Sequence, residues 1–323
     1  MLTFAFFLKS YMGDLDRAKR LVTTFRDNNV DRIHLYIMCP KEDIAEFVAF
    51  QGDDITVLPE EGIATEIYTE DTQWTKGYLN QEIYKLAFWE LGLCENYQCL
   101  DSDAIFLRPF YRADFMFDEH IPYTFIVEDK ELQSDYYYCE GYWNGRRKQI
   151  KLIEDAYDYH PRKLMTCHGF QVFNRTVLQS LKEEFLDPKG FTYKNLIDIS
   201  PYEFSWYNLW LQKNEVIPIH ICEPNFKTIH LKQHHINEVL RGMTIEHWAK
   251  GYLGLIVNSN YGVGDGKYGD LSMYNVWNAD IPNEIISNNY SFYKRLYYGG
   301  KIKKLTDYYA LVKNKVRRII GKN

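Results

Sequence analysis

The sequence offers little support for a zinc knuckle, a membrane span or a secreted protein. Its six cysteines include no Cys-x-x-Cys pair, which excludes a zinc knuckle and a thioredoxin-like redox motif. No apolar run approaches the roughly 20 residues needed to cross a bilayer. Lys9 interrupts the first apolar run, which has no basic lead and no small-residue cleavage site. We therefore expect reduced thiols and a cytoplasmic protein.

Strand-like and helix-like segments alternate over the first part of the chain. In order along the sequence, the predicted strands and helices are 3–8, 15–25, 33–38, 44–50 and 55–58. Strand, helix, strand at this spacing is typical of a parallel sheet with right-handed crossovers. We predict an α/β fold with a Rossmann-like, mixed but mainly parallel sheet flanked by helices in residues 1–285, and a tail over 286–323.

Two aspartates two residues apart end a further predicted strand, residues 97–105. Side chains alternate along a strand, so Asp101 and Asp103 are expected to project the same way and Ser102 the opposite way. Two like charges held so close favour a cation between them, and carboxylate oxygens suit Mg²⁺ or Mn²⁺. Ligands of open α/β sheets also bind at the carboxyl ends of strands. The sequence thus predicts a metal site here; the alternative is a pair of aspartates that start a turn.

Five blocks of sequence carry a resemblance to a known class of enzymes. In order, they read FAFFLKSYMGD (4–14), QEIYKL (81–86), LDSDAIFLRP (100–109), HGFQVFNRTVL (168–178) and EFSWY (203–207). With this ordered set, the chain resembles GT-A-type glycosyltransferases, and more closely a bacterial family of predicted transferases from lipopolysaccharide and capsule gene clusters. The resemblance implies a GT-A-like fold, a nucleotide-diphosphate sugar as donor, Mn²⁺ or Mg²⁺ as cofactor, and a cell-surface glycan such as lipopolysaccharide, O-antigen or capsule as acceptor.

The resemblance also implies which residues hold the metal and the donor. Asp103 would bind the metal directly, and Asp101 would contact the ribose or a metal-bound water, with Ser102 beside them on the nucleotide. A first group of donor-binding residues occupies the loop after the first strand: Lys9, Ser10 and Asp14. Lys85, on the helix before the two aspartates, would face the same pocket and meet either a phosphate or Asp101. The alternative for Lys85 is a solvent-exposed helix lysine.

The later part of the chain supplies candidates for catalysis and for a third metal ligand. Ser200 and Pro201 predict the start of a helix, and Glu203 in its first turn is a candidate for acceptor binding and for the general base; the alternative is that it only favours the helix dipole. The resemblance implies a histidine metal ligand on a late strand, best placed at His230, with His234 and His235 close behind. Lys232 or Lys227 would neutralise the leaving diphosphate. This region lacks a clean histidine-glycine-lysine motif.

Basic residues are concentrated at the end of the chain. Residues 294–323 carry ten Lys or Arg and one acid, a net +9, whereas 28 basic and 43 acidic residues leave −15 in the remainder. An apolar stripe runs through the same segment: Leu305, Tyr309, Val312, Val316 and Ile319. A basic amphipathic helix of this kind binds the anionic inner face of a membrane or packs on the protein body. Nucleic acid is not expected as a partner, because phosphate repels the acidic body.

Two other functions are compatible with the same pattern. A nucleotidyltransferase of related fold would need a glycine-rich phosphate loop with a basic signature after the first strand, and that loop is missing. A carbohydrate-binding protein would keep the fold without turnover. We expect a glycosyltransferase, with donor binding and transfer as the properties that separate it from both alternatives.

Overall fold

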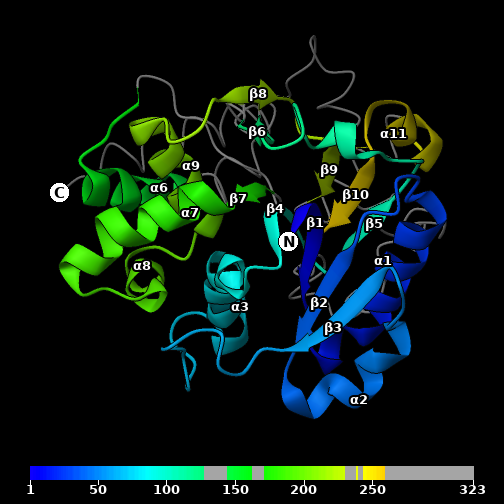
Figure 1. Cartoon of the computed structure of the whole chain (residues 1–323), viewed down its shortest axis with the longest axis horizontal. Helices are drawn as coiled ribbons and strands as arrows, with labels where there is room; N and C mark the ends of the chain where they lie inside the picture. The colour runs from blue at the N-terminus through cyan, green and yellow to red at the C-terminus, as the bar shows by residue number, and fades with distance from the viewer. Residues whose placement is uncertain (127–143, 162–170, 230–237, 239–242, 259–323) are drawn as a thin grey trace, which may run out of the picture. The chain divides into compact units, whose positions relative to one another are not determined.

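The structure is a computed structural model, and it describes residues 1–126, 144–161, 171–229, 238 and 243–258 (Figure 1). The chain divides into two compact units, the first formed by 1–230 with 246–261 and the second by 231–245 with 262–323. The first unit contains the described sheets, together with Lys85, the two aspartates and Glu203. The predicted boundary between 285 and 286 and the predicted basic tail lie outside the described residues.

A mainly parallel sheet forms the centre of the first unit. Over the described residues it has five strands in the order β3-β2-β1-β4-β7, and of these only β7 runs antiparallel to its neighbour. The strands are β1 (Leu2–Lys9), β2 (Leu35–Cys39), β3 (Ile55–Pro59), β4 (Cys94–Leu100) and β7 (Val172–Asn174). The prediction of an α/β fold with a mixed, mainly parallel sheet is confirmed.

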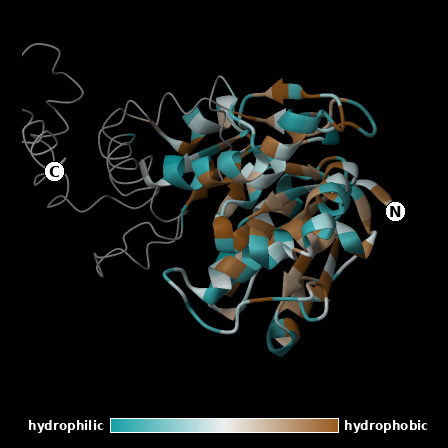
Figure 2. Cartoon of the chain, turned by 90° about the vertical axis from the view of Figure 1, so that its left-hand side faces the viewer, coloured by the Kyte–Doolittle hydropathy of each residue, from teal (hydrophilic) through white to brown (hydrophobic). Residues whose placement is uncertain are grey.

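Alternate side chains of β1 face opposite layers of helices. Phe4, Phe6 and Leu8 pack with α1 (Leu15–Asn28), whereas Ala5 and Phe7 pack on the other face. All five side chains are buried, because helices cover both faces of a parallel sheet and leave no side for water. Hydrophobic residues therefore concentrate in the strands and in the inner faces of the helices (Figure 2).

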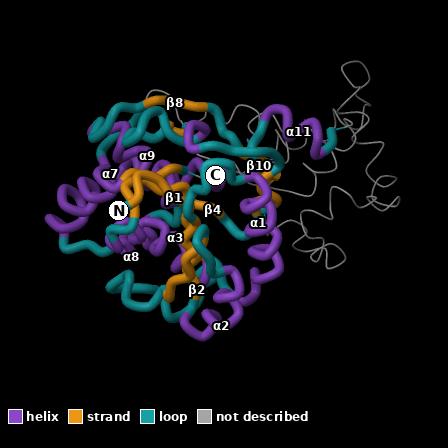
Figure 3. The backbone as a smooth tube through the Cα atoms, turned by 45° about the vertical axis from the view of Figure 1, so that its right-hand side comes forward, coloured by secondary structure: helices purple, strands orange, loops and turns teal. Residues whose placement is uncertain are grey.

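Helices form a layer on each side of the sheet (Figure 3). Side chains of α1 and of the segment that begins with α2 (Ile44–Phe47) pack on one face. The opposite face is covered by side chains from α3 (Lys76–Ala87), α6 (Asn144–Tyr157), α7 (Arg175–Leu181), α8 (Tyr193–Ile199) and α9 (Glu203–Asn214). The sequence patterns did not predict α6 or α8, whose buried apolar positions are few.

The predicted start of the late helix is wrong by two residues. Ser200 follows the last residue of α8 in an extended conformation, and its carbonyl accepts a hydrogen bond from the indole Nε1 of Trp206 at 2.8 Å. Helix α9 begins only at Glu203, after Tyr202. Ser200 therefore ends α8 instead of capping α9. The sequence pattern places it at the start of the later helix because that pattern does not predict α8.

Two smaller sheets complete the described part of the first unit. One has the order β5-β10-β9 and consists of β5 (Ala104–Phe106), β10 (Gly254–Val257) and β9 (Phe226–Ile229). The other pairs β6 (Tyr123–Phe125) with β8 (His220–Cys222). A short helix, α11 (Ile245–Gly251), precedes β10. None of the helices in the described ranges combines the length and the apolar character that a membrane crossing requires.

Candidate functional site

The two aspartates lie in the connection between two sheets. Strand β4 ends at Leu100 in the central sheet, and β5 begins at Ala104 in the smaller one. The amide of Ala104 donates to the carbonyl of Asp101 at 3.0 Å, which closes a tight turn over residues 101–104. The prediction of one strand over 97–105, with alternating side chains at 101–103, is therefore wrong. The predicted location of the two aspartates at the carboxyl end of a strand, here β4, is confirmed.

The turn is joined to the first strand through its middle residue. Ser102 is buried, and its hydroxyl lies 3.0 Å from the hydroxyl of Ser10, which is also buried. Ser10 directly follows β1, so the loop after that strand and the two-aspartate turn meet at the same edge of the sheet. The structure thus brings together two segments that the sequence separates by ninety-two residues.

Asp101 and Asp103 are held in different ways. The Oδ1 atom of Asp101 accepts a hydrogen bond from Nε2 of Gln81 at 2.7 Å, and the side chain retains 27% of its exposure. Asp103 is more buried, and its carbonyl accepts from the amide of Val257 in β10 at 3.3 Å. The turn is consequently anchored to helix α3 on one side and to the small sheet on the other.

A buried lysine connects the turn to two helices. The Nζ atom of Lys85 lies 2.9 Å from Oε1 of Glu203, 3.0 Å from Oδ1 of Asp101 and 3.3 Å from Oε2 of Glu82. We call these four residues the Lys85 cluster. Only 3% of the Lys85 side chain is exposed, so the alternative of a solvent-exposed helix lysine is wrong. Of the two contacts predicted for Lys85, with a phosphate or with Asp101, the structure contains the contact with Asp101.

Burial and charge act together on the Lys85 cluster. Burial alone lowers the pKa of Lys85, but the neighbouring charges of Asp101, Glu203 and Glu82 outweigh it and hold that pKa well above its usual value. For Glu82, burial has the largest effect and the charge of Glu203 the next, and together they raise the pKa of Glu82 well above that of an exposed glutamate. Lys85 is therefore charged, and Glu82 retains its proton to a higher pH than an exposed carboxyl group.

The raised pKa of Glu82 predicts a pH dependence of stability. Above about pH 4.5, the unfolded chain releases this proton while the folded chain keeps it, so the free energy of unfolding falls as pH rises toward the folded pKa. Glu82→Gln, which cannot ionise, is expected to gain stability relative to the parent protein between about pH 5 and about pH 8. Urea unfolding at both pH values measures the difference. Glu183→Gln, the same substitution at an exposed glutamate, serves as control, and its free energy of unfolding relative to the parent should be the same at both pH values. The prediction would be contradicted if Glu82→Gln also kept the same difference from the parent at both pH values.

Lys9 and Asp14 form ion pairs near the same edge of the sheet. The Nζ atom of Lys9 lies 2.5 Å from Oε2 of Glu60 and donates to the carbonyl of Ser10 at 2.8 Å. Glu60 follows β3, whose carboxyl end lies at the same edge as that of β1. Asp14 precedes α1 as predicted and is its N-cap residue. Its carboxylate pairs with Arg17 and accepts no hydrogen bond from the first backbone amides of the helix.

His230, the predicted third metal ligand, and Lys232, one of the two lysines predicted to meet the diphosphate, lie outside the described residues. Lys227, the other candidate lysine, lies in β9 with its Nζ atom 4.8 Å from the centroid of the Trp248 ring. Strand β9 ends at Ile229, which pairs with Val257, the residue whose amide contacts Asp103. Within the described ranges, no group of three or more His, Cys, Asp or Glu side chains is arranged to hold a metal ion. Asp101 and Asp103 are therefore the predicted metal ligands that the structure describes.

Sequence reasoning did not select Glu82 or Glu60 as site residues. Glu82 lies three residues before Lys85, within a segment whose apolar residues Ile83, Leu86 and Ala87 have the spacing of one helix face. Glu82 and Lys85 are three positions apart beside these apolar residues, and this spacing was the feature of the sequence that could have indicated a buried ion pair. For Glu60, the signal was its position directly after a strand whose carboxyl end meets that of β1.

The fold and the site define an α/β protein with a Rossmann-like sheet and a buried charge cluster at the edge where the strands end. The chain belongs to DUF6492, a family of unknown function, whose profile matches residues 3–246. That range includes Lys9, the two aspartates and Glu203. A comparison with curated proteins finds no match.

Proposed function

We propose that the protein is a metal-dependent glycosyltransferase, which moves a sugar from a nucleotide-diphosphate sugar to a hydroxyl group of a cell-surface glycan. The observation that carries the proposal is the Asp-Ser-Asp turn at the carboxyl edge of the sheet, joined to the loop after β1 and to the Lys85 cluster. This edge is where open α/β sheets bind nucleotides. The resemblance of the sequence to GT-A-type transferases supports the same function.

The two aspartates fit a divalent metal ion. Mg²⁺ is commonly bound by one or two protein carboxylates together with water and substrate phosphates, and Mn²⁺ prefers the same oxygen ligands. Asp101 and Asp103 supply this donor set from a single tight turn. When bound, the ion would supply positive charge that stabilises the leaving nucleotide diphosphate.

Glu203 is the proposed general base. As the acceptor oxygen forms its bond to the anomeric carbon and the bond from that carbon to the diphosphate breaks, the hydroxyl proton would pass to the Glu203 carboxylate. Its Oε1 atom is held by Lys85, which also holds Asp101, so one ammonium group orients the proposed base and one proposed metal ligand. Lys85 is accordingly proposed as a positioning residue.

Binding of nucleotides tests the proposal before an acceptor is known. We expect UDP, GDP or CDP to raise the midpoint of thermal unfolding in the presence of Mn²⁺ or Mg²⁺, and to have little effect with EDTA, because a ligand that binds only the folded form stabilises it by mass action. Titration calorimetry of the same pairs gives the affinity. No heat with any of these nucleotides and either metal would overturn the proposal. Release of pyrophosphate from a nucleoside triphosphate would instead indicate a nucleotidyltransferase.

We further propose that the reaction takes place at a membrane surface. The acidic body would stay in the cytoplasm, and the predicted basic tail, residues 286–323, would contact anionic lipid close to a lipid-linked glycan. The support for this part of the proposal is the net charge of +9 over residues 294–323.

A further inference from the structure

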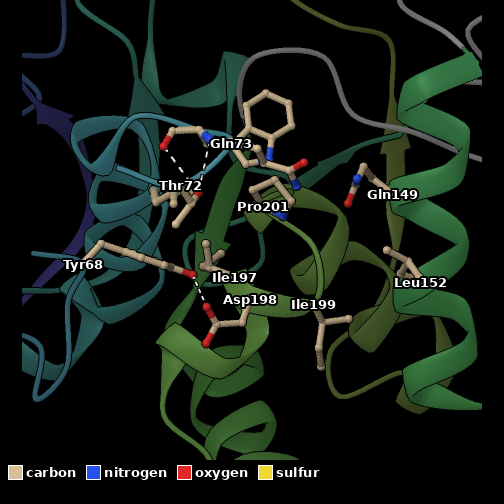
Figure 4. Close-up of a pocket in the computed structure, with 11 residues that line it drawn as sticks. Tyr68, Thr72, Gln73, Gln149, Leu152, Ile197, Asp198, Ile199 and Pro201 are labelled. Carbon is tan, nitrogen blue, oxygen red and sulfur yellow. Dashed lines mark hydrogen bonds between the residues drawn. The ribbon is translucent and has the colours of Figure 1, made fainter. Parts of the chain in front are cut away.

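A pocket of about 400 Å³ is lined by eleven residues, none of which belongs to the Lys85 cluster. Three segments line it: residues 68–79, helix α6, and the end of α8 with the connection to α9 (Figure 4). The volume is near the lower end of the range for pockets that bind small molecules. The proposed transfer reaction assigns no role to this pocket.

The pocket has an apolar wall and an aromatic residue at its surface. Leu79, Ile197 and Pro201 are buried and supply the wall. Trp74 is 37% exposed, and its ring lies 5.5 Å from the ring of Tyr78, tilted by 40°. An exposed aromatic ring that is held by a neighbouring ring offers a flat apolar surface to a ligand at little entropic cost.

The polar groups of the pocket suit hydroxyl groups. Gln149 on α6 extends its amide toward the space between α6 and Pro201, and Gln73 lies on the opposite segment (Figure 4). An amide both donates and accepts hydrogen bonds, as a hydroxyl group does. Asp198 adds a carboxylate whose Oδ1 accepts from the Tyr68 hydroxyl at 2.6 Å.

The charges of the pocket disfavour an anionic ligand. None of its eleven lining residues is a lysine or an arginine. The carboxylate of Asp198 is already paired, since the Nζ atom of Lys194 lies 3.1 and 2.9 Å from its two oxygens. The lining therefore offers a phosphate or a carboxylate no lysine or arginine to pair with, and the carboxylate of Asp198 would repel it. An uncharged ligand would not be repelled.

We infer that this pocket binds an uncharged saccharide, with Trp74 against the apolar face of a sugar ring and Gln73 and Gln149 on its hydroxyl groups. The inference does not depend on the proposed transfer reaction, because the pocket needs neither a nucleotide nor a metal. Its position is nevertheless close to the site. The Tyr78 hydroxyl donates to the carbonyl of Pro201 at 3.0 Å, and Pro201 precedes the proposed base Glu203 by two residues.

Saturation-transfer NMR on the full chain, without nucleotide and with EDTA, tests the inference. The probes are the methyl glycosides of glucose, galactose, mannose and N-acetylglucosamine, together with lactose and maltose. We expect at least one probe to bind saturably. Trp74→Ala and Gln149→Ala should each raise the dissociation constant of that probe about tenfold, because the first removes the apolar surface against the sugar ring and the second removes a hydrogen-bond partner of its hydroxyl groups. Phe117→Ala, which removes an exposed aromatic ring outside the pocket, should leave it unchanged.

Three outcomes would overturn the inference. They are the absence of saturable binding for every probe, equal affinities in the parent protein and both pocket variants, and metal-free nucleotide binding that Trp74→Ala abolishes. Circular dichroism shows whether each variant is folded, and if Trp74→Ala is not, Gln149→Ala on the partly exposed face of α6 decides. Saccharide binding with no metal-dependent nucleotide binding would support the pocket and refute the transferase, so the two proposals fail separately.

Discussion

Asp103→Asn is expected to lower metal-dependent hydrolysis of the nucleotide sugar, the reaction measurable without an acceptor, by about a thousandfold. Asparagine keeps the size of the side chain but removes the charge that the proposed metal needs. The same variant should lose the Mn²⁺-dependent part of nucleotide binding in calorimetry. Because Asp103 is buried beside the end of β10, an isosteric change is preferable to alanine, which would also leave a space.

Asp16→Asn is the matched control for this experiment. Asp16 lies in the first turn of α1 with 88% of its side chain exposed, and pairs only at the surface with Lys19 at 3.2 Å. Its loss should leave nucleotide binding and hydrolysis unchanged. Parent-like activity and metal dependence in Asp103→Asn would show that the turn does not hold the ion, and the proposed donor site would then be wrong.

Lys85→Met is expected to lower the free energy of unfolding by about 3–5 kcal/mol. Methionine fills a similar volume, but it leaves the carboxyl groups of Glu82, Asp101 and Glu203 close together without their common cation. Removing one partner of a buried ion pair costs far more than removing both, since the remaining charge stays away from water. Urea unfolding, followed by tryptophan fluorescence, measures the change.

Lys151→Met provides the comparison at an exposed pair. Lys151 is 63% exposed and pairs with Asp155 one helical turn away at 2.9 Å, so its replacement should change stability by less than about 1 kcal/mol. Adding Glu203→Gln to Lys85→Met should recover part of the lost stability, because one uncompensated carboxylate is removed. Equal, small effects at Lys85 and Lys151 would mean that water reaches the Lys85 cluster.

Local patterns in the sequence were sufficient to predict the strands and helices up to β3 and the place of the aspartates at the end of a strand. Each of these follows from periodicities of neighbouring residues. A turn at the aspartates was only the alternative to a continuous strand over 97–105. The strand ends there because β5 leaves the central sheet to pair with β10, whose residues lie about one hundred and fifty positions later.

The sequence by itself determined the class of fold and the candidate metal ligands. The apolar runs of the strands, the helical spacing between them and the Asp-Ser-Asp sequence are all properties of residues close together in the chain. Only the tertiary structure decided that Lys85 is buried among carboxyl groups, that Ser10 meets Ser102, and that three distant segments enclose the pocket beside Trp74. Lys85 and Glu203 are separated by 118 positions, and no local pattern encodes such a contact. It forms because packing of α3 and α9 on the same face of the sheet removes both side chains from water.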